Sequence, residues 1–348
     1  ARGLVDFLGE TNPAGLELEA LRDQAAAAAG RVEKARHALD IHVPPRPPGF
    51  CTGCPERPVF TAIKLLKEEI GDVHISTDIG CHSFATFEPF SLGNTILGYG
   101  MSLASSAVIP VQKKRPIAIM GDGGFWHNGL QTGVISNLFN QSDGILIIMQ
   151  NGYSSATGQQ YIPSSGQVTE VAPMTGEIEN TLRGLGVEWL KSVRTYSVEA
   201  MLGTLREAME TDVGGLKVII ADAECMLARQ RCLRLADAER LKYGQRVETP
   251  RFGIDDEVCT GDHSCIRLSG CPSLTLAPNP DPLRIEPIAQ VNNGCLGCGL
   301  CGEVAHAAVT CPSFYEAKRI QNPDVTRRIG NAFRRHVIAW MTGKEASS

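Results

Sequence analysis

Residues 116–124, PIAIMGDGG, join an apolar strand-like run to a glycine-rich turn, and residues 125–139 after them have helical character. Glycines at a strand-to-helix turn (here Gly121, Gly123 and Gly124) let backbone N–H groups approach a diphosphate, and the helix start favours its negative charge. Asp122 stands inside the turn, and Mg²⁺ binds through few protein oxygens together with ligand phosphates. Because such a turn is also common on protein surfaces, it predicts a magnesium-diphosphate site only if a second element meets it.

Residues 144–153, GILIIMQNGY, form a second apolar run that ends in polar residues. Twenty-seven residues, 124–150, separate Gly123 from Asn151. If the two runs are neighbouring strands of a parallel sheet, Asp122 and Asn151 meet at the same edge, where such sheets bind ligands. The alternative is two unrelated polar turns.

Strand-like and helix-like stretches alternate from about residue 50 to 240. The alternation predicts an α/β fold with a mostly parallel, doubly wound sheet covered by helices on both faces. The expected strands are 73–76, 116–120, 145–149 and 217–221, and the expected helices are 59–69, 125–139 and 197–210.

The ends of the chain differ from this central part. Residues 14–41 are rich in Ala, Leu, Glu and Arg and predict a helix, and the Pro-rich stretch 43–49 predicts an extended linker. The chain starts without Met, inside what reads as helix, so it is either a processed product or a piece of a larger polypeptide. At the other end, 318–341 predict an amphipathic helix with interleaved arginines, either docked on the body or serving as a basic landing site for an acidic electron carrier. We expect four parts: 1–49, 50–245, 246–316 and 317–348.

Composition restricts the class of protein. The 348 residues are 43% apolar and carry a net charge of −5, which gives no reason to expect nucleic acid as a partner. No apolar run approaches the roughly 20 residues that a membrane span needs, and no signal peptide opens the sequence. We therefore expect a cytoplasmic protein without a membrane partner.

Seven of the twelve cysteines crowd between Cys259 and Cys311, in a segment rich in Gly and Pro. Residues 295–301, CLGCGLC, followed by Cys311-Pro312, form the ferredoxin pattern, in which the remote cysteine ligates the other cluster. Zinc sites seldom use three cysteines at this double spacing. The segment predicts a small ferredoxin-like domain with two iron–sulfur sites.

An earlier copy of this pattern, residues 259–272, has Asp262 where the second cysteine belongs. By the crossed-ligand rule one 4Fe–4S site is complete, and its ligands are Cys271, Cys295, Cys298 and Cys301. The other has three sulfurs, from Cys259, Cys265 and Cys311. Asp262 is its candidate fourth ligand, a 3Fe–4S cluster is the alternative, and the adjacent His263 stays open.

Three short stretches carry a resemblance to a known family: FCTGCPER at 50–57, DIGC at 78–81 and SSATGQ at 154–159. Together with the Gly-Asp-Gly and Asn pair they resemble 2-oxoacid:ferredoxin oxidoreductases, closest to the indolepyruvate (arylpyruvate) branch, over roughly residues 50–315. The resemblance implies a further 4Fe–4S cluster held by Cys51, Cys54, Cys81 and Cys225. A zinc site or buried thiols are the alternatives, and Cys232 competes with Cys225 for the fourth place.

The resemblance also implies the cofactor of the central part. It is thiamine diphosphate, with Mg²⁺ held by the side chains of Asp122 and Asn151 and the backbone carbonyl of Tyr153. Thr157 and Gly158 match a pair that lies close to the cofactor. His127 is the expected catalytic residue, orienting the diphosphate or the substrate carboxylate, although a histidine at a helix start can also cap the helix or face solvent.

The implied reaction is the oxidative decarboxylation of a 2-oxoacid to acyl-CoA and CO₂, with electrons passed through three iron–sulfur clusters to ferredoxin. An arylpyruvate is the expected substrate, while pyruvate and branched-chain 2-oxoacids stay open. A partner domain or subunit must supply the activating Glu, since no pyrimidine-binding domain is found in residues 1–240, and we expect an oligomer. The alternatives are an electron-transfer subunit with a non-catalytic thiamine fold and a non-oxidative thiamine-dependent decarboxylase.

Overall fold

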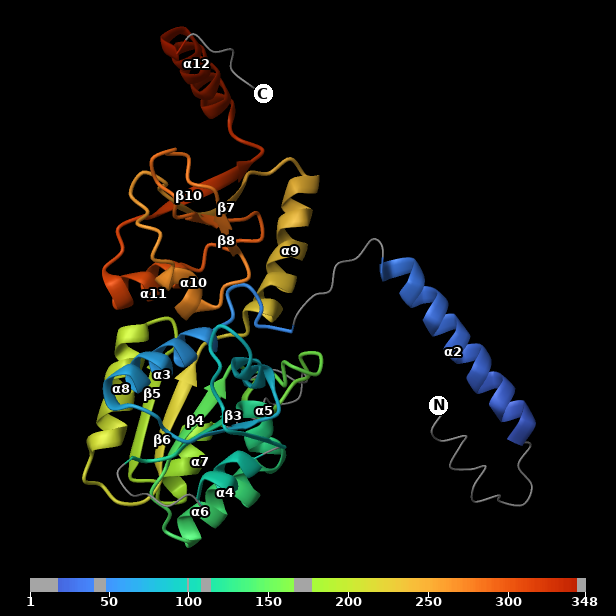
Figure 1. Cartoon of the computed structure of the whole chain (residues 1–348), viewed down its shortest axis with the longest axis vertical. Coiled ribbons are helices and arrows are strands. Elements are labelled where there is room, and N and C mark those ends of the chain that lie inside the picture. The colour runs from blue at the N-terminus through green and yellow to red at the C-terminus, as the bar shows by residue number, and fades with distance from the viewer. Residues whose placement is uncertain (1–17, 41–47, 99, 108–113, 166–176, 343–348) are drawn as a thin grey trace. The chain divides into compact units, whose positions relative to one another are not determined.

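The computed structural model describes residues 18–40, 48–98, 100–107, 114–165 and 177–342, and the chain divides into two compact units, Ala1–Pro48 and Gly49–Ser348 (Figure 1). In the first unit the described element is helix α2, Leu18–Asp40. It confirms the helix expected over 14–41 as far as residue 40. Residues 14–17 and 41, the chain start and linker residues 43–47 lie outside the described residues.

A six-stranded, wholly parallel sheet forms the centre of the second unit, with the strand order β2-β1-β3-β4-β6-β5. The strands are β1 Ile75–Asp78, β2 Thr95–Leu97, β3 Ile117–Gly121, β4 Ile145–Gln150, β5 Trp189–Arg194 and β6 Lys217–Asp222. The four expected strands are confirmed, with the first shifted by two residues. Strands β2 and β5, at the two edges of the sheet, were not expected.

Apolar residues on the two faces of this sheet enter two separate cores. Ile117 and Ile119 of β3 belong to the core that holds α3 and α8, whereas Ala118 and Met120 belong to the opposite core. Because successive side chains of a strand point to opposite faces, the sheet is doubly wound, as expected. The helices of this part are α3 Arg57–Ile70, α4 Met101–Ala107, α7 Ile178–Gly184 and α8 Val198–Glu210, with short 3₁₀ turns η1 Cys81–Thr86 and η3 Pro163–Ser165.

The helix after the glycine-rich turn is continuous but uneven. It starts as α5, Asp122–Gly124, widens into the π-helical segment η2, Phe125–Ile135, and ends as α6, Ser136–Phe139. Gly100, at φ 85°, approaches it so closely that an added Cβ would lie 2.1 Å from the Cα of Gly129. The expected helix over 125–139 is confirmed, and α4 packs directly on it because both contact positions are glycine.

Beyond the sheet, helix α9, Met226–Lys242, leads into the cysteine-rich segment (Figure 1). Two antiparallel strand pairs form there, β7 with β10 and β8 with β9. The elements are β7 Val247–Ile254, α10 Ser264–Ser269, β8 Leu274–Ala277, β9 Ile288–Val291, α11 Leu300–Val309 and β10 Phe314–Gln321. Residues 49–348 form one compact unit. The boundaries expected at 245 and 316 lie inside this unit and stay predictions.

The C-terminal helix begins later in the structure than the expected start at Lys318. Residues up to Gln321 belong to β10, which pairs with β7 along its whole length, and α12 covers Val325–Thr342. Pro323 separates the two, because proline cannot continue a helix. The apolar side chains of Ile329, Phe333 and Trp340 are 65–86% exposed, so the expected docking of this face is not seen among the described residues. Within the same residues, no helix has the length and apolar character to cross a bilayer.

Candidate functional site

The two polar strand ends meet as the sequence predicts. Strands β3 and β4 are parallel neighbours in which Gly121 lies opposite Met149, so Asp122 and Asn151 follow at the same edge. The Asp122 carboxylate accepts hydrogen bonds from the backbone N–H groups of Gly123 at 2.9 Å, Asn151 at 2.8 Å and Gly152 at 2.7 Å. Three N–H donors hold this carboxylate in one orientation at the carboxyl edge of the sheet.

Asn151 is fixed by its own loop. Its Oδ1 accepts from the Tyr153 backbone N–H at 3.1 Å and from the Ser155 hydroxyl at 2.9 Å, and its Nδ2 donates to Glu56 Oε1 at 3.4 Å. The Tyr153 carbonyl, the third expected magnesium ligand, accepts from the Ser155 hydroxyl at 3.4 Å. The oxygen-bearing groups of the expected ligand set therefore lie within one tight turn after β4.

A cleft of about 530 Å³ lies over this edge of the sheet. Its walls include Gly121, Gly123, Gly124 and Thr157, so four of the expected cofactor-binding residues line it together with Asp122, Asn151 and Tyr153. An added Cβ at Gly123 would lie 3.1 Å from the Ser154 hydroxyl oxygen, so glycine keeps this wall open. Gly158 and His127 are not among the lining residues, and His127 is exposed, so its catalytic role stays a prediction.

Three further ionisable residues line the cleft that the sequence did not single out as site residues: Glu56, Asp78 and His82. Burial, then the Asp122 carboxylate, raises the pKa of Glu56 to about 8, and burial raises the pKa of Asp122 to about 7. The pKa of Asp78 is raised for the same reason. Glu56 Oε2 and His82 Nε2 are buried without a hydrogen-bond partner among the described residues.

These buried groups test whether the cleft fits Mg²⁺ and a diphosphate. Burial removes hydration from the three carboxyl groups in this cleft, so their ionised forms are costly. A bound divalent cation would compensate their negative charge. Carboxylate, amide and carbonyl oxygens are the ligands that Mg²⁺ takes in proteins. The residues present therefore fit a magnesium-bound diphosphate.

Beside the cleft, four cysteines that the family resemblance grouped line one cavity of about 350 Å³: Cys51, Cys54, Cys81 and Cys225. Burial, followed by Glu56, raises the pKa of the Cys54 and Cys81 thiols. Cys232 is exposed on α9 and does not line the cavity. Glu56, Cys81, Asn151 and Ser155 line both spaces, so the cleft and this first sulfur set share a wall.

The second sulfur set consists of Cys271, Cys295, Cys298 and Cys301. Burial raises the pKa of the Cys301 thiol, and the nearby thiols of Cys271, Cys298 and Cys295 raise it further. The structure thus brings the remote Cys271 to the Cys-x-x-Cys-x-x-Cys run, as the crossed-ligand rule predicts.

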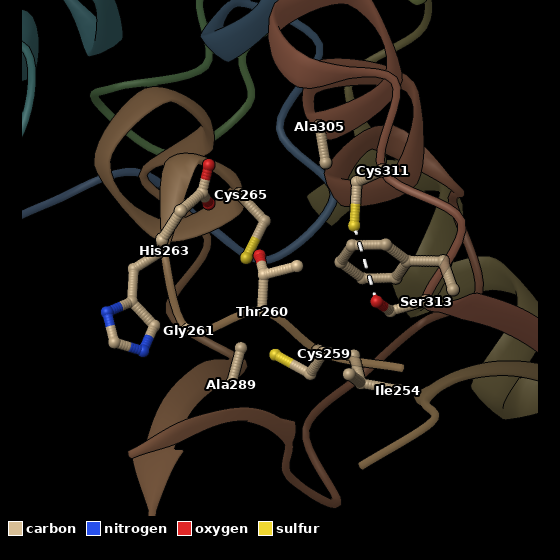
Figure 2. A pocket seen from close by; sticks show the side chains of 12 residues that line it. Ile254, Cys259, Thr260, Gly261, His263, Cys265, Ala289, Ala305, Cys311 and Ser313 are labelled. Atoms are coloured by element: carbon tan, nitrogen blue, oxygen red, sulfur yellow. Dashed lines mark hydrogen bonds between the residues drawn. The ribbon is translucent and has the colours of Figure 1, made fainter. Parts of the chain in front are cut away.

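Cys259, Cys265 and Cys311 form the third sulfur set, and Figure 2 shows their thiols around one space. Burial, then the thiols of Cys259 and Cys311, raises the pKa of Cys265 to about 12. Asp262 lines the same pocket, with its carboxylate accepting from the Ser264 N–H at 2.8 Å and hydroxyl at 3.0 Å. The His263 ring points away from the sulfurs in Figure 2 and its Nε2 donates to the Pro287 carbonyl at 2.8 Å.

The type and number of these donors suit iron–sulfur clusters, because soft thiolate sulfurs in sets of three or four are their usual ligands. Within the described ranges, no group of three or more His, Cys, Asp or Glu is arranged to hold a metal ion.

The first and second sulfur sets also lie next to each other. The Thr52 and Ser273 hydroxyls are 3.3 Å apart, joining the loop of Cys51 and Cys54 to the turn after Cys271-Pro272. An added Cβ at Gly53 would lie 3.5 Å from Leu296, which stands between Cys295 and Cys298. The order across the unit is therefore cleft, first set, second set.

Comparison with known proteins gives the class first. Residues 78–221 match the family "Thiamine pyrophosphate enzyme, C-terminal TPP binding domain". This range runs from the last residue of β1 to the last but one of β6 and includes Asp122 and Asn151, and the fold is consistent with it. The chain therefore contains the thiamine-diphosphate-binding domain of a thiamine enzyme.

More particularly, the chain is a distant homologue of indolepyruvate oxidoreductase subunit IorA. It is 30% identical to that subunit from Archaeoglobus fulgidus over 76% of this chain and 27% identical to that from Pyrococcus horikoshii over 75%. In both cases it spans 40% of the relative's length. A solved 2-oxoglutarate:ferredoxin oxidoreductase from Magnetococcus marinus is 18% identical, over 52% of this chain and 66% of that one, with a TM-score of 0.41.

Proposed function

We propose that this chain is the thiamine-binding, iron–sulfur-carrying part of a 2-oxoacid:ferredoxin oxidoreductase that decarboxylates an arylpyruvate such as indolepyruvate oxidatively. One observation carries the proposal: the oxygen-lined cleft and the first sulfur set share a wall made by Glu56, Cys81, Asn151 and Ser155. A thiamine decarboxylase without redox chemistry has no use for sulfur ligands beside its cofactor. The shared wall favours the oxidative reaction.

Within the cleft, each residue has an assigned task. Asp122, Asn151 and the Tyr153 carbonyl would hold Mg²⁺, and the backbone of Gly121, Gly123 and Gly124 would face the diphosphate. Thr157 and Gly158 would lie along the cofactor, and His127 would orient the diphosphate or the substrate carboxylate. Thiamine diphosphate supplies the carbanion chemistry when bound, and the chain supplies its binding and orientation.

The three sulfur sets would hold three clusters that take up electrons one at a time. The first set would hold a 4Fe–4S cluster beside the cleft, and the second a 4Fe–4S cluster next to it. The third set has only three sulfurs, with Asp262 as the candidate oxygen ligand or a 3Fe–4S cluster in its place. The pose of His263, which donates to Pro287, favours Asp262 over His263.

Several components lie outside this chain. A pyrimidine-binding domain or subunit would supply the activating Glu, coenzyme A would accept the acyl group, and ferredoxin would accept the electrons. The working enzyme would be an oligomer.

Iron, sulfide and thiamine stoichiometry on the intact assembly tests the proposal. We expect thiamine diphosphate bound with Mg²⁺, iron and acid-labile sulfide sufficient for three clusters, and bleaching of the visible absorbance when an arylpyruvate and coenzyme A are added. An assembly that is colourless and binds no thiamine would refute it. Zinc in place of iron, without bleaching, would favour a non-oxidative decarboxylase.

A further inference from the structure

Arg57 is a completely buried arginine at the start of α3, three residues after Cys54. Its Nη1 donates to the backbone carbonyl of Ser269 at 2.8 Å, and Ser269 lies two residues before Cys271. Its Nε and Nη2 are buried with no hydrogen-bond partner among the described residues. No carboxylate forms an ion pair with Arg57 in that part of the chain.

A buried guanidinium in this state is unusual. Moving a charge out of water is costly unless it is paired, and each unpaired buried donor adds to the cost. Glu56, the adjacent acid, faces the cleft and bonds to Asn151 instead. Arg57 therefore has a charge and two donor nitrogens, Nε and Nη2, that have no hydrogen-bond partner among the described residues.

Arg57 lies close to cysteines of two sulfur sets, and the groups that these cysteines would hold are the partners that its charge lacks. Cys54, of the first sulfur set, is in the main core, and Cys298, of the second, packs against that core. Burial raises the pKa of both thiols, and the Arg57 guanidinium is among the groups that lower it. The Thr52–Ser273 contact also joins the loop of the first sulfur set to the loop of the second. Arg57 thus lies between the first and second sulfur sets.

We infer that Arg57 is a positioning residue for electron transfer, whose charge raises the reduction potentials of the clusters on both sides of it while the third cluster is unaffected. This inference rests on the proposed function, since it requires clusters in both sets. Adding an electron makes a cluster more negative, so a buried cation stabilises the reduced form. Net charge and hydrogen bonds to sulfur are recognised determinants of cluster potential.

An EPR-monitored redox titration of the iron-loaded protein tests the inference. Arg57→Gln removes the charge but keeps a donor for the Ser269 carbonyl. We expect the one-electron reduction equilibrium of the two adjacent clusters to fall about tenfold, which corresponds to about 59 mV. The third cluster, in the same molecule, is the internal control and should shift less than twofold. Arg57→Lys keeps the charge and should restore most of the wild-type potential.

Arg115→Gln is the matched control variant. Arg115 also donates to backbone carbonyls, those of Ala208, Met209 and Thr211, but it precedes β3 at the opposite edge of the sheet from the cleft. Its removal should leave all three potentials unchanged. If Arg57→Gln does not load iron, Arg57→Met replaces it as the neutral variant.

Four results would overturn the inference. The first two are a neutral variant with full iron and unshifted potentials, and an equal shift of the potentials of all three clusters. The other two are an Arg57→Lys potential as low as that of Arg57→Gln, and loss of iron in both neutral variants, which would make Arg57 a structural residue. Failure of the proposed function is distinguishable, because it appears in the wild-type assembly as missing iron and thiamine.

Discussion

The carboxylate of Asp122 accepts the backbone N–H of Asn151 at 2.8 Å, which ties the ends of two neighbouring strands together. The two side chains expected to bind magnesium are thus held at the same edge of the sheet.

Asp122→Asn should therefore abolish binding of thiamine diphosphate with Mg²⁺. The amide removes the negative charge that the metal needs and places an N–H group where one carboxylate oxygen accepted. Isothermal titration with the cofactor should show at least a hundredfold weaker binding, while the visible cluster absorbance stays. Asp222→Asn, at the end of β6, is the control and should bind normally, because Asp222 does not line the cleft. Full activity in Asp122→Asn would refute the site.

The raised pKa of Glu56 should make the stability of the metal-free protein depend on pH. Its pKa is raised by burial from 4.5 to about 8, so the folded protein keeps a proton that the unfolded chain releases above about 4.5. The free energy of unfolding should fall as pH rises from about 4.5 to 8 and then level off. Glu56→Gln should reduce this decline by a few kcal/mol, in urea unfolding followed by circular dichroism.

Two measurements accompany that experiment. Glu68→Gln, exposed on the same helix, should retain the wild-type pH profile. In Glu56→Gln the remaining slope should be the sum of Asp122, whose raised pKa acts in the same direction up to about pH 7, and His82, whose lowered pKa acts in the opposite direction below about pH 6.5. Identical pH profiles of the wild type and Glu56→Gln would show that Glu56 is ionised in the fold.

Cys81→Ser should remove one cluster of three. Cys81 lies in the wall between the cleft and the first sulfur set, and serine is a poor ligand for a cluster that needs thiolates. Iron and sulfide should fall by about a third, with thiamine binding retained. Cys232→Ser, exposed on α9, should keep its full iron content. An unchanged iron content in Cys81→Ser would place this cysteine in a structural role.

Asp262→Cys should complete the third sulfur set with a fourth thiolate. The pattern of the other cysteines puts this residue where a second cysteine would stand, and Asp262 lines the pocket with the three sulfurs. The EPR signal of one cluster should change to that of an all-cysteine type, with a small loss of stability because the Ser264 N–H loses its acceptor. An identical spectrum would contradict the assignment of Asp262 as a ligand.

The sheet was predictable because three of its four inner strands contain apolar runs. Strands β3, β4 and β6 are buried on both faces, so their sequences stand out from their surroundings. Strand β5, at the sheet edge, mixes buried residues with partly and fully exposed ones and was not found. The last four residues of strand β10, 318–321, were included in the expected C-terminal helix; they contain no apolar run, and the pairing with β7 defines the strand.

In the site, residues in contiguous motifs could be found and those assembled by packing could not. Asp122 and Asn151 follow apolar strands at a recognisable spacing. Glu56 meets Asn151 across 95 residues of sequence, and its burial depends on how α3 lies against the sheet. His82 is one residue past a predicted cysteine ligand, where nothing local indicates that its ring is buried in the cleft wall.

The first turn of α3 also limits how this protein can be divided. The side chains of Arg57 and Thr61 donate hydrogen bonds to backbone carbonyls of the cysteine-rich segment, those of Ser269 and Leu268. Cutting the chain after residue 245 would strip these side chains of their acceptors and uncover the loop of Cys51 and Cys54. The cysteine-rich segment is therefore not a separable module, and its replacement by a ferredoxin from another source would have to include a matching version of residues 51–61.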